Sequence, residues 1–306
     1  MSDEVTNSVD GHVSGPVVQA RDVHGDVHLY GGARFIVPTE VEKPQAFGAG
    51  AEVTVGQRTY LVQAHLAEER WSDDGTTWRR QARCKAPDGH VWLRQATPAG
   101  ALGAEADLLK ALRGTGFPRV VQFDVTGRTT TLVSTWPTSS SGKPCDGLDA
   151  LVGTHVMDSL RLFRLCGGLA GLGTTLGSLH ERGLAHRGLT PDGVIVLDDG
   201  RLVLRDLGLA ARPVGRNEHP SAYQAPEQHM RGSGNVGGWT DVYQVAALAY
   251  HVIAGRPAGP LPLTSWAPVP ERLAAAVQAA LAVDPAQRPD MRSFGAMVLA
   301  ARADIH

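Results

Sequence analysis

The chain has 306 residues, of which 42% are hydrophobic and 20% are charged, and its formal net charge is −2 at pH 7. This composition predicts a globular protein with a large core, and the near-neutral charge argues against a nucleic-acid-binding surface across the chain. No uninterrupted apolar run of about 18 residues is present, so we expect no membrane-spanning helix.

The first residues, Met1-Ser2-Asp3-Glu4, lack the basic and apolar regions of a signal peptide. The three cysteines, Cys84, Cys145 and Cys166, are far apart and lack metal-ligand spacing, which predicts free thiols in a reducing compartment. We therefore expect a cytoplasmic protein. Abundant Ala, Gly, Arg and Pro with scarce Lys indicate a GC-rich bacterial genome, such as that of an actinobacterium.

A short repeat lies in residues 1–37, which we interpret as a tail. The segments Val13-Ser14-Gly15-Pro16-Val17 and Val23-His24-Gly25-Asp26-Val27 both follow the pattern V-x-G-x-V. Alternating valines predict two short strands that share one apolar face. The valines expected to mediate self-association are Val13, Val17, Val18, Val23 and Val27.

This tail is similar to the short amyloid-signalling motifs of some bacterial immune proteins, including those likened to the RIP homotypic interaction motif. Val18-Gln19-Ala20-Arg21 matches its V-Q-x-G core except for the final glycine. The resemblance implies in-register stacking with protein partners that carry the same motif. A disordered leader and a β element packed on its own domain are the alternatives. A metal site from His24, Asp26 and His28 is not expected, because no further ligand lies nearby.

After the tail, residues 38–57 form a predicted linker that contains Pro38 and Pro44. Period-two alternation then predicts three strands. Helical periodicity follows them. The predicted strands are Tyr60–Leu66, Trp78–Cys84 and His90–Arg94, and the helix is Ala101–Leu112.

The second half of the chain is predominantly helical in its pattern. An apolar helix is predicted at Leu160–Arg182, ending before Gly183, and another at Thr240–Tyr250. Between them, two short strands are joined by the turn Asp198-Asp199-Gly200. A strand-rich segment followed by a helical one predicts an α+β fold.

Four motifs stand in a fixed order in this second half. They are His186-Arg187-Gly188-Leu189-Thr190-Pro191-Asp192-Gly193, Asp206-Leu207-Gly208, Ala225-Pro226-Glu227 and Asp284-Pro285-Ala286-Gln287-Arg288-Pro289. The series resembles the protein kinases, with H-R-D-L-x-x-x-N, D-F-G, A-P-E and D-P-x-x-R-P. The resemblance covers roughly residues 58–302 and implies a bilobal fold, with a β-rich N-lobe at 58–137 and a helical C-lobe at 138–302.

The resemblance also implies that the catalytic positions are degenerate. Gly188 replaces the Asp that receives the substrate proton, Gly193 replaces the Asn that holds a metal ion, and Thr190 replaces a phosphate-contacting Lys. Glycine can neither accept a proton nor bind a metal. We therefore expect no catalytic residue here and interpret the domain as a pseudokinase.

A vestigial nucleotide site is implied by Arg94 at the phosphate-anchoring Lys, Glu105 at the helix position that pairs with it, and Asp206 at the metal-binding Asp. The glycine-rich phosphate loop is replaced by Ala67–Thr76, which contains four acidic residues. No cofactor is therefore expected. ATP with magnesium is the alternative, with Asp206 then the metal ligand.

Other kinase positions are retained, and the resemblance assigns them to the structural core. Asp241 takes a buried anchor position, and Arg288 is expected to bridge Glu227. The activation segment Leu209–Gln224 carries Pro220 where bacterial kinases place a threonine, so a phosphorylation switch is not expected. The predicted core residues are His186, Arg187, Gly208, Glu227, Asp241 and Arg288.

These features predict a signalling adaptor or scaffold that binds protein partners and forms homo-oligomers through the tail, without nucleic-acid or membrane binding. Two alternatives stay open. One is an atypical active Ser/Thr kinase that uses Asp206, Arg94 and Asp192 with a relocated base. The other is a nucleotide sensor without turnover.

Overall fold

The structure is a computed structural model, and it describes residues 47–63, 68–71, 78–97, 102–153, 157–215, 218, 221–229 and 236–306. The predicted tail lies outside these residues, so its strands and its self-association stay predictions.

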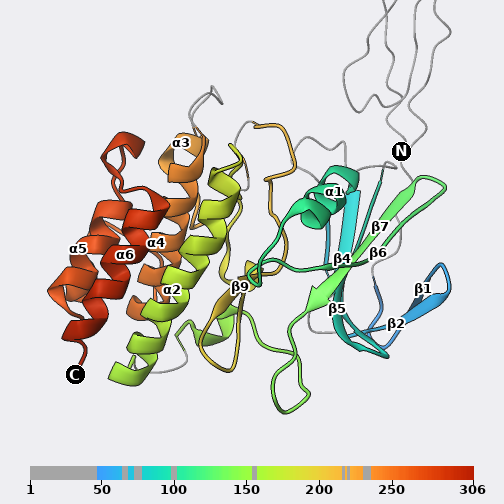
Figure 1. Cartoon of the computed structure of the whole chain (residues 1–306), viewed down its shortest axis with the longest axis horizontal. Coiled ribbons are helices and arrows are strands. Elements are labelled where there is room, and N and C mark those ends of the chain that lie inside the picture. Colours follow the sequence, from blue (N-terminus) through green and yellow to red (C-terminus); the bar gives the residue numbers. More distant parts are fainter. Residues whose placement is uncertain are drawn as a thin grey trace, which may run out of the picture. The chain divides into compact units, whose positions relative to one another are not determined.

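A single antiparallel sheet forms the N-lobe (Figure 1). Its order is β1-β2-β4-β5-β7-β6. Strand β3 pairs with the first half of β4, on the same edge of β4 with which β2 pairs further along. The predicted strands at 78–84 and 90–94 correspond to β4 and β5, and the one at 60–66 overlaps β2 at residues 60–62, with residues 64–66 outside the described part of the chain. The strands are β1 (Glu52–Val55), β2 (Arg58–Val62), β3 (Glu68–Trp71), β4 (Trp78–Ala86), β5 (Gly89–Thr97), β6 (Val120–Thr126) and β7 (Thr129–Trp136).

The linker prediction is wrong at its C-terminal end. Strand β1 lies inside residues 38–57 and pairs with β2, with Val53 opposite Tyr60, and Phe47 is buried in the core of the sheet. The folded domain therefore begins before residue 58. A four-residue edge strand gives too short an alternation to be recognised, because its burial depends on a partner strand.

The two faces of β5 have different roles. Val91 and Leu93 pack into the apolar core on one side of the sheet. Since side chains alternate along a strand, Trp92 and Arg94 point to the opposite side. Helix α1 (Gly103–Ala111) buries Ala106 and Leu109 in the main hydrophobic cluster.

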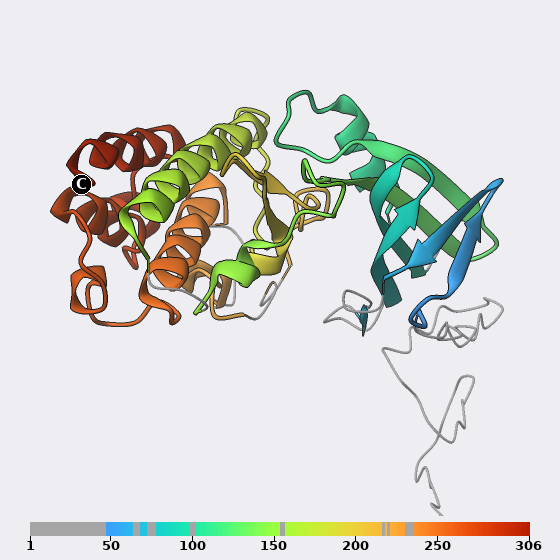
Figure 2. The same cartoon turned by 90° about the horizontal axis from the view of Figure 1, so that it is seen from below.

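The C-lobe consists of packed helices and one small hairpin (Figure 2). Its helices are α2 (Ser159–His180), α3 (Pro226–His229), α4 (Gly238–Ala254), α5 (Glu271–Ala280) and α6 (Met291–Ala301). The hairpin strands are β8 (Val194–Val196) and β9 (Leu202–Leu204). Short 3₁₀ turns are η2 (Leu148–Leu151), η3 (Pro191–Gly193), η5 (Leu263–Ser265), η6 (Pro285–Gln287) and η7 (Arg302–Asp304).

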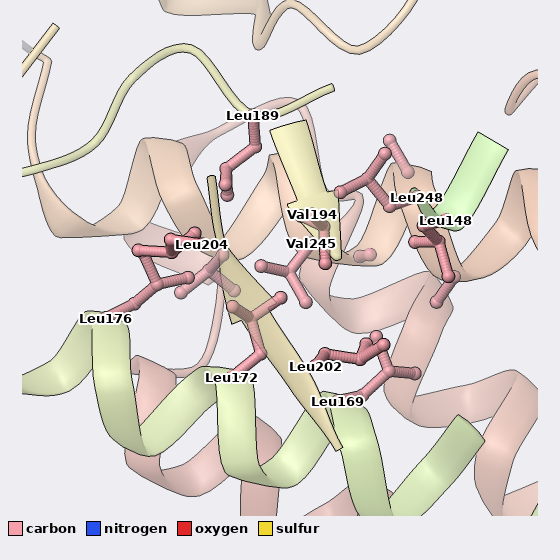
Figure 3. Packing of buried hydrophobic residues seen from close by; sticks show 14 of the residues in the cluster. Leu148, Leu169, Leu172, Leu176, Leu189, Val194, Leu202, Leu204, Val245 and Leu248 are labelled. Atoms are coloured by element: carbon pink, nitrogen blue, oxygen red, sulfur yellow. The ribbon is translucent and has the colours of Figure 1, made fainter. Parts of the chain in front are cut away.

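Leucines on one stripe of α2 form the centre of the C-lobe core. Leu169, Leu172 and Leu176 recur at helical spacing and face the hairpin and α4 (Figure 3). The predicted helix at 160–182 is thus α2, and the predicted strands at 193–197 and 201–204 are β8 and β9. The predicted α+β class, with a β-rich N-lobe and a larger helical portion, is confirmed.

None of the helices in the described part of the chain is long and apolar enough to cross a bilayer.

All three cysteines are free and buried, as the sequence predicted. Burial raises the pKa of the Cys84 thiol to about 12 and that of Cys166 to about 11, so these thiols stay protonated and inert at neutral pH.

Candidate functional site

Asp241, near the start of α4, holds the loop that corresponds to the catalytic loop of kinases. Its carboxylate is fully buried and accepts hydrogen bonds from the backbone N–H groups of His186 (2.8 Å) and Arg187 (2.7 Å). His180 Nε2 lies 2.8 Å from the same carboxylate. Arg187 has φ +58°, a left-handed conformation that costs energy for a non-glycine residue and is fixed here by these bonds.

The loop contains no catalytic side chain at the positions where kinases have one. Gly188 and Gly193 are both buried, and the N–H of Gly193 donates to the carbonyl of Thr190 at 3.0 Å. The loop does carry one carboxylate, Asp192. That carboxylate pairs with Arg205 Nη1 at 2.7 Å.

Arg94 and Glu105 form the ion pair expected between the third predicted strand and the following helix. Two parallel hydrogen bonds of 2.8 Å join the guanidinium to the carboxylate, and both side chains are buried. Glu105 also accepts the N–H of Leu207 at 3.1 Å. The pair therefore connects α1 directly to the Asp206-Leu207-Gly208 triplet.

Arg205 occupies the centre of the site. Its Nη1 donates to Asp192 Oδ2 at 2.7 Å, and its Nε donates to Asp206 Oδ2 at 3.0 Å. One guanidinium thus bridges the carboxylate of the catalytic loop and the carboxylate of the triplet. In active kinases the Asp at the position of Asp206 binds a metal ion.

The electrostatics agree with this geometry. Burial opposes ionisation of Asp206, but Arg205 and Arg94 outweigh it and hold the pKa of that carboxyl well below its usual range. Burial likewise opposes ionisation of Asp192, and Arg205 again lowers the pKa. The pKa of Arg205 is raised by the same two carboxylates despite its own burial. All three groups stay charged at neutral pH.

Trp92 fills the space next to this ion cluster. It projects from the same face of β5 as Arg94, is almost completely buried, and packs with Trp136, Ile195 and Val203. The two indole rings are 5.6 Å apart at their centroids. The guanidinium of Arg205 lies over the Trp92 ring at 4.7 Å, a cation–π contact.

A buried carboxylate in the activation segment binds Arg187. Arg187 Nη1 donates to Glu218 Oε1 at 2.6 Å, and both side chains are buried. Glu218 Oε1 also accepts the N–H of Gly215 at 2.6 Å, and Arg187 Nη2 donates to the carbonyls of Leu209 and Arg212. Arg187 thus donates three side-chain hydrogen bonds to groups of the chain itself. Pro220 lies outside the described residues, so the expected absence of a phosphorylation switch stays a prediction.

Two glutamines, Gln228 and Gln244, support the back of the loop. Gln228 Nε2 donates to the carbonyl of Arg187 at 2.8 Å, and Gln244 Oε1 accepts the N–H of Leu189 at 3.0 Å.

Gly208 has φ +55°, and a Cβ there would lie 2.5 Å from the His186 ring. Only glycine fits this position.

The predicted bridge between Glu227 and Arg288 is present. Two hydrogen bonds of 2.8 and 2.9 Å join the side chains, and both are almost fully buried. The remaining Arg288 donors bind backbone carbonyls, including that of Ala282 at 2.7 Å. Thr240 Oγ1 donates to Glu227 at 2.8 Å. Every charge in this cluster thus has a partner.

The residues of this site do not fit a magnesium–nucleotide complex. Within the described ranges, no group of three or more His, Cys, Asp or Glu side chains is arranged to hold a metal ion. Asp206 Oδ2 already accepts from Arg205 at 3.0 Å, and its Oδ1 accepts the N–H of Gly208 at 2.9 Å. The Trp92 ring is buried against Arg205 beside them.

Sequence comparison finds partial similarity to protein kinases. The chain is 36% identical over 87 residues to the serine/threonine-protein kinase PknL of Mycobacterium tuberculosis, a match covering 26% of this chain and 21% of the kinase. It is 32% identical over 84 residues to the maternal embryonic leucine zipper kinase of Xenopus laevis, covering 25% of this chain and 13% of that kinase. The chain thus matches only a minor part of these relatives. No protein-family model matches it.

Comparison with solved structures is more extensive. A double mutant of the PknI kinase domain of Mycobacterium tuberculosis superposes with a TM-score of 0.59 at 22% identity, covering 84% of this chain and 100% of the domain. A structure titled PpkA-294 apo form gives a TM-score of 0.57 at 18% identity, covering 83% of this chain and 99% of that chain. The fold is therefore that of the protein kinases.

The sequence analysis did not identify three residues of the site: Trp92, Arg205 and Glu218. For two of them the sequence contained a feature that could have indicated their role. Trp92 stands at the alanine of the kinase pattern V-A-I-K, where a large ring is unexpected, and Arg205 directly precedes the retained Asp206. Glu218 had none beyond its place in the activation segment.

Proposed function

We propose that this chain is a catalytically inactive kinase-like protein that serves as a signalling adaptor or scaffold, with the N-terminal tail mediating homotypic association. The observation that carries the proposal is the guanidinium of Arg205, which bridges Asp192 and Asp206 where a kinase needs a metal ion. Gly188 and Gly193, in the same loop, offer no replacement base or ligand.

The chemistry explains why these changes are decisive. Phosphoryl transfer depends almost entirely on positioning and on stabilising charge at the phosphates. A missing general base alone costs roughly 10²–10⁴-fold in rate. Here the base and one metal ligand are glycines, and the remaining metal ligand, Asp206, is neutralised by Arg205.

The side-chain packing argues against a nucleotide sensor as well. In kinases the residues equivalent to Arg94 and Asp206 contact the ATP phosphates and the metal ion. The adenine ring of a bound ATP is therefore expected near them, between the lobes. That neighbourhood contains Trp92, packed on Trp136 and Ile195. Binding ATP then requires expulsion of a buried indole, which costs several kcal/mol.

An adaptor needs a fixed surface but no cofactor. Contacts within this chain hold three elements of such a surface in place. The Arg94–Glu105 pair fixes α1, Asp241 fixes the loop, and Glu218 holds the activation segment. In active kinases, phosphorylation, ATP and metal contribute to ordering these elements. Internal ion pairs take over that role here.

The first test is biochemical. Purified full-length protein is expected to transfer no phosphate from radiolabelled ATP to itself or to a generic substrate. ATP with or without magnesium is expected to change the melting temperature by no more than about 1 °C, because a ligand stabilises only a protein that binds it. The matched control is Asp206→Ala.

Each alternative has its own outcome in this test. Transfer that is abolished by Asp206→Ala would overturn the pseudokinase assignment in favour of an atypical kinase. A magnesium-dependent rise in melting temperature without transfer would instead support the nucleotide sensor. Transfer that survives the substitution identifies a contaminating kinase.

The tail has a separate test. If residues 11–32 stack through interdigitated valines, the full chain forms assemblies that bind an amyloid-sensitive dye. We expect Val17→Asp together with Val23→Asp to abolish them by burying unpaired charge. His24→Ser is the matched control and is expected to leave assembly intact, because His24 points outward on the predicted strand. A full-length protein that stays monomeric and dye-negative would leave the tail without a role in association.

A further inference from the structure

A second candidate binding site lies in the C-lobe, where α2 begins and α6 ends. Helices α2 and α6 pack side by side, and the turn between β8 and β9 lies next to α2 (Figures 1 and 2). A hollow of about 420 Å³ opens between these three elements. Its side-chain lining comes from Leu160, Phe163, Arg164, Asp199, Arg201 and Arg302. No residue of the kinase-like site contributes to it.

Glycines on α2 create the hollow. A Cβ at Gly168 would lie 2.6 Å from the carbonyl oxygen of Gly200, so glycine is required for α2 to lie this close to the turn. A Cβ at Gly167 would contact the guanidinium of Arg302 at 3.5 Å. The floor of the hollow is therefore backbone, and the longer side chains around it form the rim.

Among the described residues, the lining carries an excess of positive charge, with three arginines and the single carboxylate of Asp199. Arg201 is paired with Asp199 at 2.7 Å, but among the described residues neither Arg164 nor Arg302 has a carboxylate within ion-pair distance. The central guanidinium carbon of Arg302 lies 3.5 Å from the centroid of the Phe163 ring, and the buried Nε has no hydrogen-bond partner in the described part of the chain. The hollow therefore favours an anionic ligand.

Apolar surface adjoins this charge. Leu160 is 60% exposed and Phe163 is 41% exposed, one helical turn apart on the same face of α2. Exposed aromatic and arginine side chains around a concave surface are characteristic of the energetic centre of a protein interface. A flat membrane surface does not enter such a hollow, whereas a single side chain of a peptide does.

We propose that this hollow binds an acidic peptide segment of a protein partner. An apolar side chain of the peptide packs on Leu160 and Phe163, and flanking carboxylates pair with Arg164 and Arg302. The site is independent of phosphoryl transfer and of the tail, so it stands whether or not the adaptor proposal holds.

Fluorescence anisotropy on the full-length protein tests this site. The probes are labelled peptides that alternate Leu or Phe with Asp and Glu, and the control peptides carry Lys in place of the acids. We expect saturable binding of the acidic peptides only, weakened by added salt. Arg164→Glu is expected to weaken binding by about tenfold or more. Phe163→Ser is expected to weaken it similarly through loss of apolar contact.

The matched control is Arg292→Glu, the same charge reversal at a side chain that is 90% exposed on α6 outside the hollow. It is expected to leave binding unchanged, which separates local pairing from net charge. Equal binding to Arg164→Glu and to the parent would overturn the proposal. So would equal binding of acidic and basic peptides, or binding of inorganic polyphosphate or of phosphatidylserine vesicles but of no peptide.

Discussion

Replacing Arg288 by Ala is expected to lower the free energy of unfolding by about 3–5 kcal/mol, because it leaves Glu227 buried without its partner. The Arg288 side chain is completely buried and also donates to the carbonyls of Ala282, Trp239 and Val283. A domain of this size loses roughly 2–4 °C per kcal/mol, so we expect the melting temperature to fall by about 6–20 °C. Thermal and urea unfolding monitored by circular dichroism measure both values.

Two further variants show that the loss comes from an unpaired charge. Arg292→Ala removes an exposed arginine whose partner, Glu181, lies 3.4 Å away at the surface, and it is expected to shift the melting temperature by no more than about 1 °C. The double variant Glu227→Leu with Arg288→Met is expected to lose less than either single change, since no buried charge then remains. An Arg288→Ala protein that melts with the parent would show that this pair does not stabilise the lobe.

The sequence predicted those parts of the fold whose residues repeat at a regular interval. The strand alternation at 78–84 and 90–94 matches β4 and β5, and the leucine spacing of α2 is visible over its full length. Strand β1 was missed because it is four residues long and gains its order from pairing with β2. The local sequence pattern predicts a strand poorly where pairing with a distant segment determines the structure.

The pairs in the candidate site were predictable only where a motif fixed both members. Arg94 with Glu105 and Glu227 with Arg288 each join two recognisable positions of the kinase pattern, and both pairs are present. Arg205 and Asp192 are thirteen residues apart and belong to no such pairing. Their contact depends on how the hairpin β8–β9 folds back on the loop.

Glu218 shows a different limit. The sequence showed that the predicted activation segment lacks a threonine, but it did not show that Glu218 pairs with Arg187. The pairing depends on the left-handed backbone of Arg187, which directs its guanidinium to Glu218 and to two carbonyls. No local pattern encodes that convergence, because the partners come from separate loops.

Removing the cation at the centre of the site is the most direct test of its role. Arg205→Met keeps a side chain that can pack on Trp92 but removes the cation hydrogen-bonded to Asp206, so that Arg94 is the remaining arginine beside this buried carboxylate. We expect a loss of about 3–5 kcal/mol in the free energy of unfolding at neutral pH. Most of it comes from Asp206, because the Asp192 side chain is 40% exposed and water screens it.

This loss is expected to depend on pH in a defined direction. In the parent the pKa of Asp206 lies below its unfolded value of about 3.9, so its contribution is complete above that pH and is lost as pH falls. Without Arg205 the pKa of Asp206 rises relative to the parent. The difference in stability between parent and variant is therefore largest at neutral pH and shrinks as the pH is lowered toward 4. Urea unfolding across that range measures it.

Adding magnesium to these variants tests whether Arg205 takes the place of a metal ion or only stabilises the fold. If Arg205 occupies the metal position, millimolar magnesium is expected to raise the melting temperature of Arg205→Met, since the ion can pair with Asp192 and Asp206. The parent and Arg205→Lys, which keep a positive charge there, are expected not to respond. Magnesium that stabilises the parent equally would mean that the two carboxylates already accept a metal beside Arg205. A variant that is destabilised but indifferent to magnesium would assign Arg205 a purely structural role.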